Sequence, residues 1–445
     1  MNKNFELYNK TPSNFCVLPF IHKAIDSNGD FKPCCVANPH LTETGNVANI
    51  NDIPFDDFLK SSVIQNFKQS FKNNERNSLC DVCWKVDDVN GESHRKRAIH
   101  FLVSQPNTQD SEVISLQNTF MDFFQDKISW NIVQDKLDKL EFPYDLEIEP
   151  GTTCNFKCHF CGPYASSSWQ QDHMLLYNSS KKEVEGFTKL GHWALDSEMW
   201  NSQAMYNGKK FHFMGGEPML INSHFDFLEK ISKRKQAKDV IVAYNTNGSK
   251  LPPNFDLYKK FNTTLVAFSI DAIEEKFEYQ RYPGKWKEVE NNIKTWITSM
   301  PTKLAVKIDP GWSVLNLLYM AELFIWADDI KKQFKLTDSQ FDFDGHYYFG
   351  PFYCPTTLRP EQKELFKLKM ETDIKLLLSS DLDSQMLTRA DITYKNMIKH
   401  MFSRDAWTQE IENSRTFRIK GLDKLRNQSL KNSQPELNTI LKIYE

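Results

Sequence analysis

The sequence Cys154-Asn155-Phe156-Lys157-Cys158-His159-Phe160-Cys161 follows closely on the strand-like run Leu146-Glu147-Ile148-Glu149. Its Cys-x-x-x-Cys-x-x-Cys spacing supplies three thiolates where an iron-sulfur cube takes four, so one iron is left open. An open coordination position is typical of catalytic metal sites, whereas structural sites fill every position. Taken alone, the stretch also fits a structural zinc site in which a histidine such as His159 is the fourth ligand.

Three more strand-like runs follow along the chain, and each ends in polar residues or glycine. Residues 211–214 lead into Gly215-Gly216-Glu217-Pro218, residues 240–244 into Asn245-Thr246-Asn247-Gly248-Ser249, and residues 265–268 into Ser269-Ile270-Asp271-Ala272. Each segment alone is ordinary turn material. In this order, however, they place polar groups at the carboxyl ends of successive strands, where parallel barrels build their active sites. The sequence therefore predicts a parallel α/β fold with a site at that edge.

The cysteine spacing, the aromatic Phe160 and the order of the later segments resemble the radical S-adenosylmethionine (SAM) superfamily. The resemblance implies a 4Fe-4S cluster on Cys154, Cys158 and Cys161, with SAM on the fourth iron. It implies reductive cleavage of SAM to a 5'-deoxyadenosyl radical that abstracts a substrate hydrogen atom. The residues that it implies for SAM binding are Phe160 for the adenine, Gly215, Gly216 and Glu217 for the amine, Asn247 and Ser269 for the ribose or carboxylate, Asp271 beside them, and Arg281 for the carboxylate.

A second group of cysteines precedes this segment: Cys16, Cys34, Cys35, Cys80 and Cys83. Between the first two, Asn28-Gly29 predicts a hairpin turn that brings distant thiols together. The spacing resembles the twitch module, the shorter relative of the SPASM domain, which implies an auxiliary 4Fe-4S cluster on Cys16, Cys34, Cys80 and Cys83 and leaves Cys35 unassigned. Four thiolates would saturate the cluster, which favours a structural or electron-relay role, and structural zinc is the alternative. Such modules usually follow the barrel, whereas this one precedes it.

Composition narrows the class of protein. The chain has 445 residues, and its 55 basic and 58 acidic residues give a net charge of −3, which argues against nucleic-acid or anionic-membrane binding as its main role. No apolar run approaches the roughly 20 residues of a membrane span. Nine clustered cysteines suit a reducing compartment, so we expect a cytoplasmic enzyme. The basic runs His94-Arg95-Lys96-Arg97 and Lys233-Arg234-Lys235 are expected to be solvated.

We expect an α/β protein: a partial (β/α)6 barrel of the TIM type with an N-terminal cysteine-rich hairpin module and a C-terminal helical extension. The expected domains are the auxiliary module (1–90), a connector with one helix near 113–140 (91–143), the barrel (144–353) and the extension (354–445). Residues 304–308 and 341–343 are the last two expected strands. Phe55, Phe58, Leu59, Val63, Phe67 and Phe71 recur at helical spacing and predict one amphipathic helix over 55–71.

Acidic and aromatic residues after the last two strands are candidates for the substrate pocket. They are Asp309, Trp312, Asp342, Asp344, His346, Tyr347 and Tyr348, of which we expect two or three to line it. Asp309 and Asp344 are the candidate catalytic proton acceptors. Cys354 is a candidate hydrogen-atom donor, and a buried small hydrophobe is its alternative role.

Relatives with SPASM or twitch modules mostly modify peptides or proteins, so the resemblance implies oxidative modification of such a substrate. It also implies an electron donor such as flavodoxin or ferredoxin. Two alternatives stay open: dehydrogenation or epimerisation of a small polar molecule such as a sugar or aminoglycoside, and a noncatalytic iron-sulfur or zinc binding module.

Overall fold

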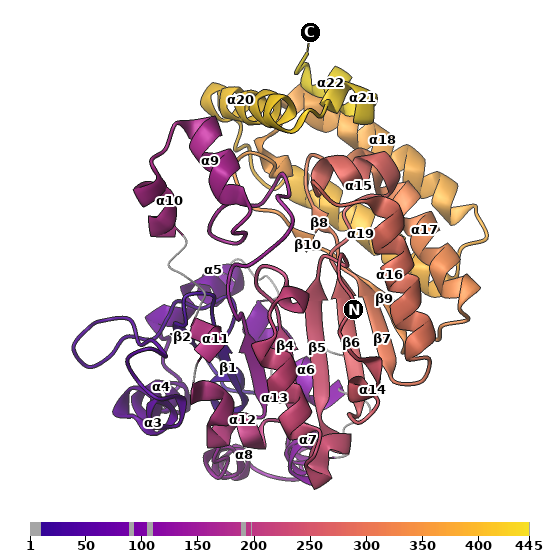
Figure 1. The fold of residues 1–445 in the computed structure, drawn as a ribbon. Helices are drawn as coiled ribbons and strands as arrows, with labels where there is room; N and C mark the ends of the chain where they lie inside the picture. Colours follow the sequence, from indigo (N-terminus) through magenta and orange to yellow (C-terminus); the bar gives the residue numbers. More distant parts are fainter. Residues whose placement is uncertain (1–9, 89–92, 105–109, 188–192, 197, 445) are drawn as a thin grey trace. The chain divides into compact units, whose positions relative to one another are not determined.

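The computed structural model describes residues 10–88, 93–104, 110–187, 193–196 and 198–444 of an α/β protein (Figure 1). Its strands are β1 (His22–Ile25), β2 (Phe31–Lys32), β3 (Asp145–Ile148), β4 (Lys210–Phe213), β5 (Ile241–Thr246), β6 (Thr263–Phe268), β7 (Leu304–Ile308), β8 (Gly311–Trp312), β9 (Phe341–Phe343) and β10 (His346–Tyr347). The main sheet has the order β2-β1-β3-β4-β5-β6-β7-β9, and β8 pairs separately with β10. The six expected barrel strands are all present, as β3 to β7 and β9.

The sheet is mixed but mostly parallel. β3 pairs in parallel with β1 and β4, β4 with β5, and β7 with β9, whereas β1 and β2 form an antiparallel hairpin. Apolar side chains such as Ile148, Phe211, Phe213 and Val242 are fully buried, as is usual for parallel strands that are covered on both faces.

Helices account for most of the remaining chain. The α-helices are α2 (Leu18–Ile21), α3 (Phe55–Lys60), α4 (Ser62–Lys72), α5 (Asp81–Asp88), α6 (His94–Ser104), α7 (Ser111–Phe124), α8 (Trp130–Asp138), α9 (Trp169–Tyr177), α10 (Lys181–Phe187), α11 (Trp193–Asp196), α12 (Gln203–Asn207), α13 (Ser223–Ile231), α14 (Phe255–Tyr258), α15 (Glu274–Gln280), α16 (Trp286–Ser299), α17 (Met320–Gln333), α18 (Pro360–Leu378), α19 (Ser384–Met401), α20 (Gln409–Arg426), α21 (Leu430–Ser433) and α22 (Pro435–Leu441). The 3-10 helices are η1 (Ser78–Cys80), η2 (Glu198–Asn201), η3 (Pro218–Leu220), η4 (Lys235–Asp239), η5 (Leu317–Tyr319) and η6 (Pro355–Thr357). No helix in the described part of the chain is long and apolar enough to cross a membrane.

The chain divides into two compact units. Unit 1 consists of residues 1–152, 189–244 and 256–264, and unit 2 of residues 153–188, 245–255 and 265–445. In unit 1, Phe20, Phe67, Phe120 and Val133 share one apolar core to which α2, α4, α7 and α8 contribute. In unit 2 the expected C-terminal helices are present, and α18 packs against α17 and α19.

Two expected helices are each interrupted in the structure. The predicted helix 55–71 is α3 and α4, because Ser61 has an extended backbone and its hydroxyl donates to the Phe58 carbonyl at 2.7 Å. Such local side-chain bonds compete with helix continuation. The break also shifts the buried face, so Ile64 rather than Val63 is buried. The predicted helix near 113–140 is α7 and α8, separated where Asp126 has a positive φ of 59°.

The basic run at residues 94–97 is not wholly solvated, because Arg95 is 4% exposed. Its guanidinium lies 2.5 Å from the nearly buried Asp87 carboxylate, which also pairs with Lys96. Arg95 Nη1 donates to the Phe15 carbonyl at 2.9 Å, and the guanidinium lies over the Trp84 ring. Arg95 therefore holds α5 and the backbone next to Cys16, an arrangement that spacing alone did not predict.

Replacing Arg95 by Met tests this buried ion pair. Breaking a buried pair typically costs about 3–5 kcal/mol because the remaining charge loses its partner. Since Lys96 still pairs with Asp87, we expect the free energy of unfolding to fall by about 3 kcal/mol, the lower end of this range. This corresponds to a fall in melting temperature of about 6 °C or more, which thermal unfolding followed by fluorescence measures. The control is Lys85→Met, which removes an exposed pair with Asp81 that contributes about 0.3–0.5 kcal/mol. Equal melting temperatures for the two variants would contradict the assignment.

Candidate active site and iron-sulfur sites

The loop of residues 154–161 lies in unit 2 and contains no helix or strand. Its backbone N–H groups are held by neighbouring segments: Lys157 donates to the Tyr282 carbonyl at 2.6 Å and His159 to the Gln280 carbonyl at 2.8 Å. The Cys161 N–H donates to the Cys158 carbonyl at 3.0 Å, which turns the last part of the loop back on itself. We refer to residues 154–161 as the cluster loop.

Helix α9 and the residues before it hold the carbonyls of the cluster loop. Trp169 Nε1 donates to the Cys158 carbonyl at 2.9 Å, and Ser168 Oγ donates to the Cys154 carbonyl at 2.6 Å. The Cys154 N–H in turn donates to Ser167 Oγ at 3.3 Å. Sequence reasoning missed these residues, because no family motif covers them and a tryptophan at the start of a helix is equally typical of a core position.

The three thiols of the cluster loop are not joined in disulfides, and Cys161 interacts electrostatically with the other two. Burial, and after it the neighbouring Cys158 and Cys154, raises the pKa of Cys161 to about 12. Burial also raises the pKa of Cys158, and Arg281 opposes this rise. Thiols with raised pKa values must lose their protons when a metal binds. Three neighbouring thiols in one loop fit a cluster that takes three protein ligands.

Arg281 is fixed beside these thiols by Asp271. Its Nε donates to Asp271 Oδ2 at 2.6 Å, and Asp271 Oδ1 also accepts from the Gly311 N–H at 2.7 Å. Arg281 Nη1 lies 4.0 Å from Cys158 Sγ. Although burial lowers the pKa of Arg281, Asp271 and the thiols raise it overall, so the guanidinium stays charged. Asp271 therefore orients Arg281, and the guanidinium lies 5.3 Å from the centre of the Phe160 ring.

Asn247 approaches another cysteine of the loop. Its Nδ2 lies 3.8 Å from Cys154 Sγ and donates to Asn155 Oδ1 at 3.2 Å, while its Oδ1 accepts from the Ser249 N–H. The Ser269 N–H donates to the Thr246 carbonyl at 2.9 Å, at the ends of β6 and β5. Within unit 2 the structure thus gathers most of the predicted cluster and SAM residues: Cys154, Cys158, Phe160, Cys161, Asn247, Asp271 and Arg281.

The predicted Gly-Gly-Glu segment lies in unit 1, after β4. Gly215 has φ +110°, and a Cβ at this position would lie 2.8 Å from the Gly151 carbonyl oxygen, so only glycine fits. The Gly216 N–H donates to the same carbonyl at 3.0 Å. Glu217 is fully buried, and its Oε1 accepts from the Met219 N–H at 3.0 Å.

Two acids follow the ends of β7 and β9, as expected. Asp309 is 3.0 Å from Lys307 Nζ and 3.8 Å from His346 Nδ1. Burial raises the pKa of Asp309, but His346 and Lys307 together bring it below its usual value. For Asp344, burial raises the pKa, which suits a proton acceptor better than the low pKa of Asp309 does.

The other candidate pocket residues after β7 and β9 differ in their burial and in their contacts. Trp312 is 1% exposed and packs near Phe324, so it is a core residue. Asp342 forms an ion pair with Arg389 at 2.8 Å, and Tyr347 stacks on His400. The side chains of His346 and Tyr348 remain partly exposed.

Cys354 is fully buried, and its thiol lies 3.1 Å from Thr356 Oγ1 and 3.9 Å from His400 Nε2. Its predicted role as a hydrogen-atom donor stays a prediction.

The four auxiliary cysteines all lie in unit 1 and interact with one another. Burial, and then Cys34 and Cys83, raises the pKa of Cys80 to about 12, and burial raises that of Cys34 to about 11. Burial, then Cys34 and Cys80, raises the pKa of Cys16. Cys35 instead lies 3.9 Å from His94 Nε2. In the described ranges no three Cys, His, Asp or Glu side chains have the arrangement of a single metal-ion site.

The predicted hairpin brings the first two of these cysteines together. β1 pairs with β2 through Ala24↔Lys32 and Ile25↔Phe31. In the turn, Gly29 has φ +85° and donates its N–H to the Asp26 carbonyl at 2.9 Å. Cys34 comes two residues after the end of β2, so the Asn-Gly turn predicted the local structure correctly.

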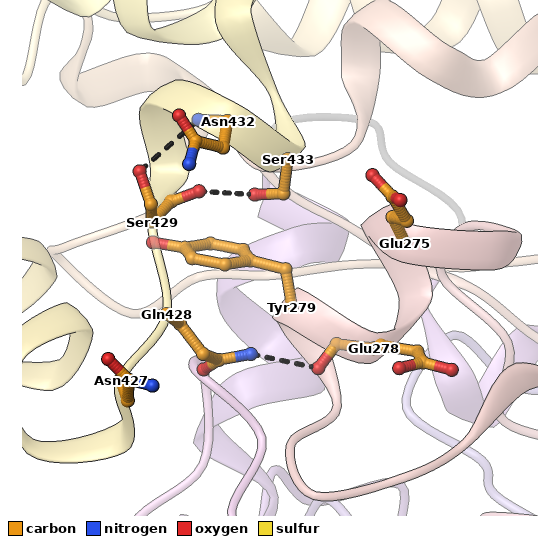
Figure 2. A pocket seen from close by; sticks show the side chains of 8 residues that line it. All are labelled: Glu275, Glu278, Tyr279, Asn427, Gln428, Ser429, Asn432 and Ser433. Atoms are coloured by element: carbon orange, nitrogen blue, oxygen red, sulfur yellow. Dashed lines mark hydrogen bonds between the residues drawn. The ribbon is translucent and has the colours of Figure 1, made fainter.

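A polar pocket of about 360 Å³ lies in unit 2, between the end of α15 and residues 427–433 (Figure 2). The residues that line it are Glu275, Glu278, Tyr279, Asn427, Gln428, Ser429, Asn432 and Ser433. Gln428 Nε2 donates to the Glu278 carbonyl at 3.1 Å across it. None of the residues predicted for SAM or substrate lines this pocket, and no sequence motif indicated it.

Two families match this chain. Residues 148–312 match the radical SAM superfamily, and residues 16–84 match the SPASM iron-sulfur cluster-binding domain. The first range contains the cluster loop, and the second contains all five N-terminal cysteines. The predicted family is thus confirmed, and so are the cofactors: a 4Fe-4S cluster with SAM and an auxiliary iron-sulfur cluster. The second match favours iron-sulfur over structural zinc.

Similar curated proteins include GTP 3',8-cyclases. That of Actinobacillus pleuropneumoniae serotype 5b (strain L20) is 25% identical over 158 residues, which is 35% of this chain and 41% of the cyclase. That of Campylobacter lari is 27% identical over 135 residues, 30% of this chain and 37% of the cyclase. The alignments thus span less than half the length of these relatives.

Similar solved structures include the following two. Native anSMEcpe with bound AdoMet and the Cp18Cys peptide has a TM-score of 0.32 and 18% identity, over 53% of this chain and 60% of that chain. Streptococcus suis SuiB bound to S-adenosylmethionine has a TM-score of 0.33 and 14% identity, over 72% of this chain and 65% of that chain.

Replacing Arg281 by Lys tests its assignment to the SAM carboxylate. Lysine keeps the charge beside Asp271 but loses the planar pair of donors, so we expect SAM affinity to fall about tenfold, or ~1.4 kcal/mol, with the cluster still assembled. Isothermal titration of anaerobically reconstituted protein measures this. The control Arg389→Lys changes a half-exposed ion pair and should bind SAM as the wild type does. Unchanged affinity in Arg281→Lys would remove Arg281 from the site.

Proposed function

Since the chain belongs to the radical SAM superfamily and carries a SPASM iron-sulfur domain N-terminal to its radical SAM domain, we propose that it is an enzyme that oxidatively modifies a peptide or protein. We also propose that its sheet forms the partial (β/α)6 barrel of that superfamily, acting in the cytoplasm with a donor such as flavodoxin or ferredoxin. When bound, the reduced cluster and SAM supply a 5'-deoxyadenosyl radical that takes a hydrogen atom from the substrate.

The observation that carries this proposal is the convergence of polar side chains on the cluster loop. Arg281 approaches Cys158 and is held by Asp271, while Asn247 approaches Cys154. In our proposal the three cysteines hold the cluster, and Arg281 binds the SAM carboxylate with the donors that Asp271 leaves free. A fixed guanidinium orients its partner without a further loss of side-chain freedom.

Oxidation is favoured over epimerisation by the surroundings of Cys354. An epimerase returns a hydrogen atom to the substrate radical, and Cys354 is the candidate donor. Its thiol is fully buried against Thr356 and His400, which favours the structural role. In an oxidation the substrate radical instead loses a second electron and a proton. The auxiliary cluster is the proposed electron acceptor, and Asp344, whose pKa is raised by burial, suits the role of proton acceptor.

Exposed aromatic side chains near the cluster loop favour a peptide or protein substrate. Phe160 lies 6.1 Å from Tyr348, ring centre to ring centre, and burial followed by Tyr164 raises the pKa of Tyr348. Tyr164 and Phe349 are 59% and 65% exposed. Exposed large aromatic side chains are enriched where proteins bind peptides and other proteins.

A small polar substrate is the second candidate. The similar cyclases are named for GTP. At the carboxyl ends of β7 and β9, however, Asp309 and Asp344 share one lysine, Lys307, and this excess of carboxylates disfavours a triphosphate. The same acids suit the ammonium groups of an aminoglycoside. A noncatalytic binding module is disfavoured, because Arg281 and Asn247 lie beside the cysteines as SAM binding requires.

Iron content and SAM cleavage test the core of the proposal. We expect anaerobically reconstituted wild type to hold about eight irons per chain, about four for each cluster. It should form 5'-deoxyadenosine from SAM and dithionite, detected by mass spectrometry. Changing Cys154, Cys158 and Cys161 together to Ala should halve the iron and abolish 5'-deoxyadenosine. If the wild type instead holds four irons and one zinc per chain, the proposed auxiliary cluster is wrong, but the proposed SAM cluster is not contradicted.

Adding GTP separates the two substrate classes. If the substrate is a peptide or protein, millimolar GTP leaves the rate of 5'-deoxyadenosine formation unchanged, because radical SAM cleavage is accelerated by the true substrate. A synthetic peptide encoded by a short reading frame beside the gene should increase that rate. An increase with GTP, together with a modified nucleotide in the product, would contradict the peptide proposal.

A further inference from the structure

Helix α20 reaches the cluster loop through one buried arginine. Arg418 Nη2 donates to the carbonyls of His159 at 2.8 Å and Cys161 at 2.7 Å, and its Nε donates to His159 at 3.2 Å. Its Nη1 donates to Tyr177 Oη at 2.9 Å. Helices α9 and α20 are in contact within unit 2, as Figure 1 shows. A single side chain therefore holds two carbonyls of the loop and one residue of α9.

Arg418 is buried without a matching negative charge. It is 6% exposed, and no carboxylate among the described residues forms an ion pair with it. Its guanidinium lies 4.5 Å from the centre of the Trp169 ring, whose Nε1 donates to the Cys158 carbonyl. A buried charge without a counter-charge is costly, so a negative group nearby would stabilise the arrangement.

A second arginine of α20 adds to this excess of positive charge. Arg426 Nε donates to Asp172 Oδ2 at 2.9 Å, but the same carboxylate also pairs with Lys157 of the cluster loop at 2.7 Å. Its two terminal nitrogens are buried and have no hydrogen-bond partner. Lys157 and Arg426 thus share the single carboxylate of Asp172, and Arg418 adds a third buried cation that pairs with no carboxylate of the described residues. An iron-sulfur cluster on three thiolates is net negative, and reduction adds another negative charge.

We propose that Arg418 is a positioning residue of the SAM cluster: it fixes the cluster loop through the carbonyls of His159 and Cys161, and its buried charge favours the reduced cluster. This inference rests on the proposed function in placing the cluster on Cys154, Cys158 and Cys161. It gives α20, for which the sequence offered no role, a part in positioning the cluster loop. Charges and hydrogen bonds around a cluster are established determinants of its reduction potential.

The same helix supplies a matched control, Arg415. It is also buried, at 1% exposure, and also bonds backbone carbonyls, those of Phe352 and Thr357. Its hydrogen bonds go to Phe352 and Thr357, which lie outside the cluster loop. Replacing Arg415 therefore imposes a similar burial penalty on α20 without releasing the loop.

The experiment compares Arg418→Lys and Arg418→Gln with the same two changes at Arg415. Each protein is reconstituted anaerobically, and iron loss to a chelator, the midpoint potential and the electron paramagnetic resonance spectrum are measured. The SAM-site signal is identified by its change when SAM is added. Wild type that holds iron but shows no such change would overturn the proposed function and leave the loop contacts untouched.

For Arg418→Lys, which keeps the charge but loses the forked contacts, we expect iron loss about tenfold faster and a midpoint potential close to that of the wild type. For Arg418→Gln we expect equally fast iron loss and a lower potential. Both Arg415 variants should resemble the wild type in iron loss and potential, even if their melting temperatures fall. If Arg418→Gln does not fold, the rate of iron loss from Arg418→Lys alone tests the inference. Iron loss in the Arg418 variants no faster than in the Arg415 variants would overturn the inference.

Discussion

A buried loop without regular secondary structure must find hydrogen-bond donors for its carbonyls elsewhere, and the cluster loop depends on this constraint. Its donors come from three separate segments of unit 2: Ser168 and Trp169, the Cys161 N–H within the loop, and Arg418 of α20. The three cysteines are therefore placed by contacts to their backbone, which leaves their sulfur atoms available for iron. Asn247, which follows β5, and Arg281, which follows α15, can then approach those sulfurs.

In unit 1 a buried arginine likewise donates a hydrogen bond to a backbone carbonyl beside a cluster cysteine. Arg95 donates to the Phe15 carbonyl next to Cys16, and its carboxylate partner Asp87 lies on α5, the helix that carries Cys83. The two arginines differ in one respect. Arg95 has the carboxylate of Asp87 as a counter-charge, whereas Arg418 has only neutral hydrogen-bond partners. This contrast suits a saturated cluster in unit 1 and a cluster that is reduced during turnover in unit 2.

The sequence predicted the strands and the cysteine groups because these depend on short-range signals. Apolar runs ending in polar residues gave β3 to β7 and β9, and Asn28-Gly29 gave the hairpin. The helix 55–71 was predicted with correct spacing but without its break, because whether the Ser61 hydroxyl bonds the Phe58 carbonyl is decided by packing. Arg418 was beyond prediction, because it meets Cys161 across 257 residues of sequence and no motif marks it. Asp271 was predicted near the cofactor, and its role in orienting Arg281 needed the geometry.

The long interval between Cys161 and Arg418 has a consequence for the biosynthesis of the protein. The ribosome makes all seven predicted cluster cysteines well before it makes α20. A nascent chain therefore carries the ligands of both clusters before it has Arg418, which holds the cluster loop. The cluster loop therefore gains its full set of carbonyl donors only after residue 418 has been translated. A chain terminated before α20 would keep all seven predicted cluster cysteines and would lack the arginine that binds the His159 and Cys161 carbonyls.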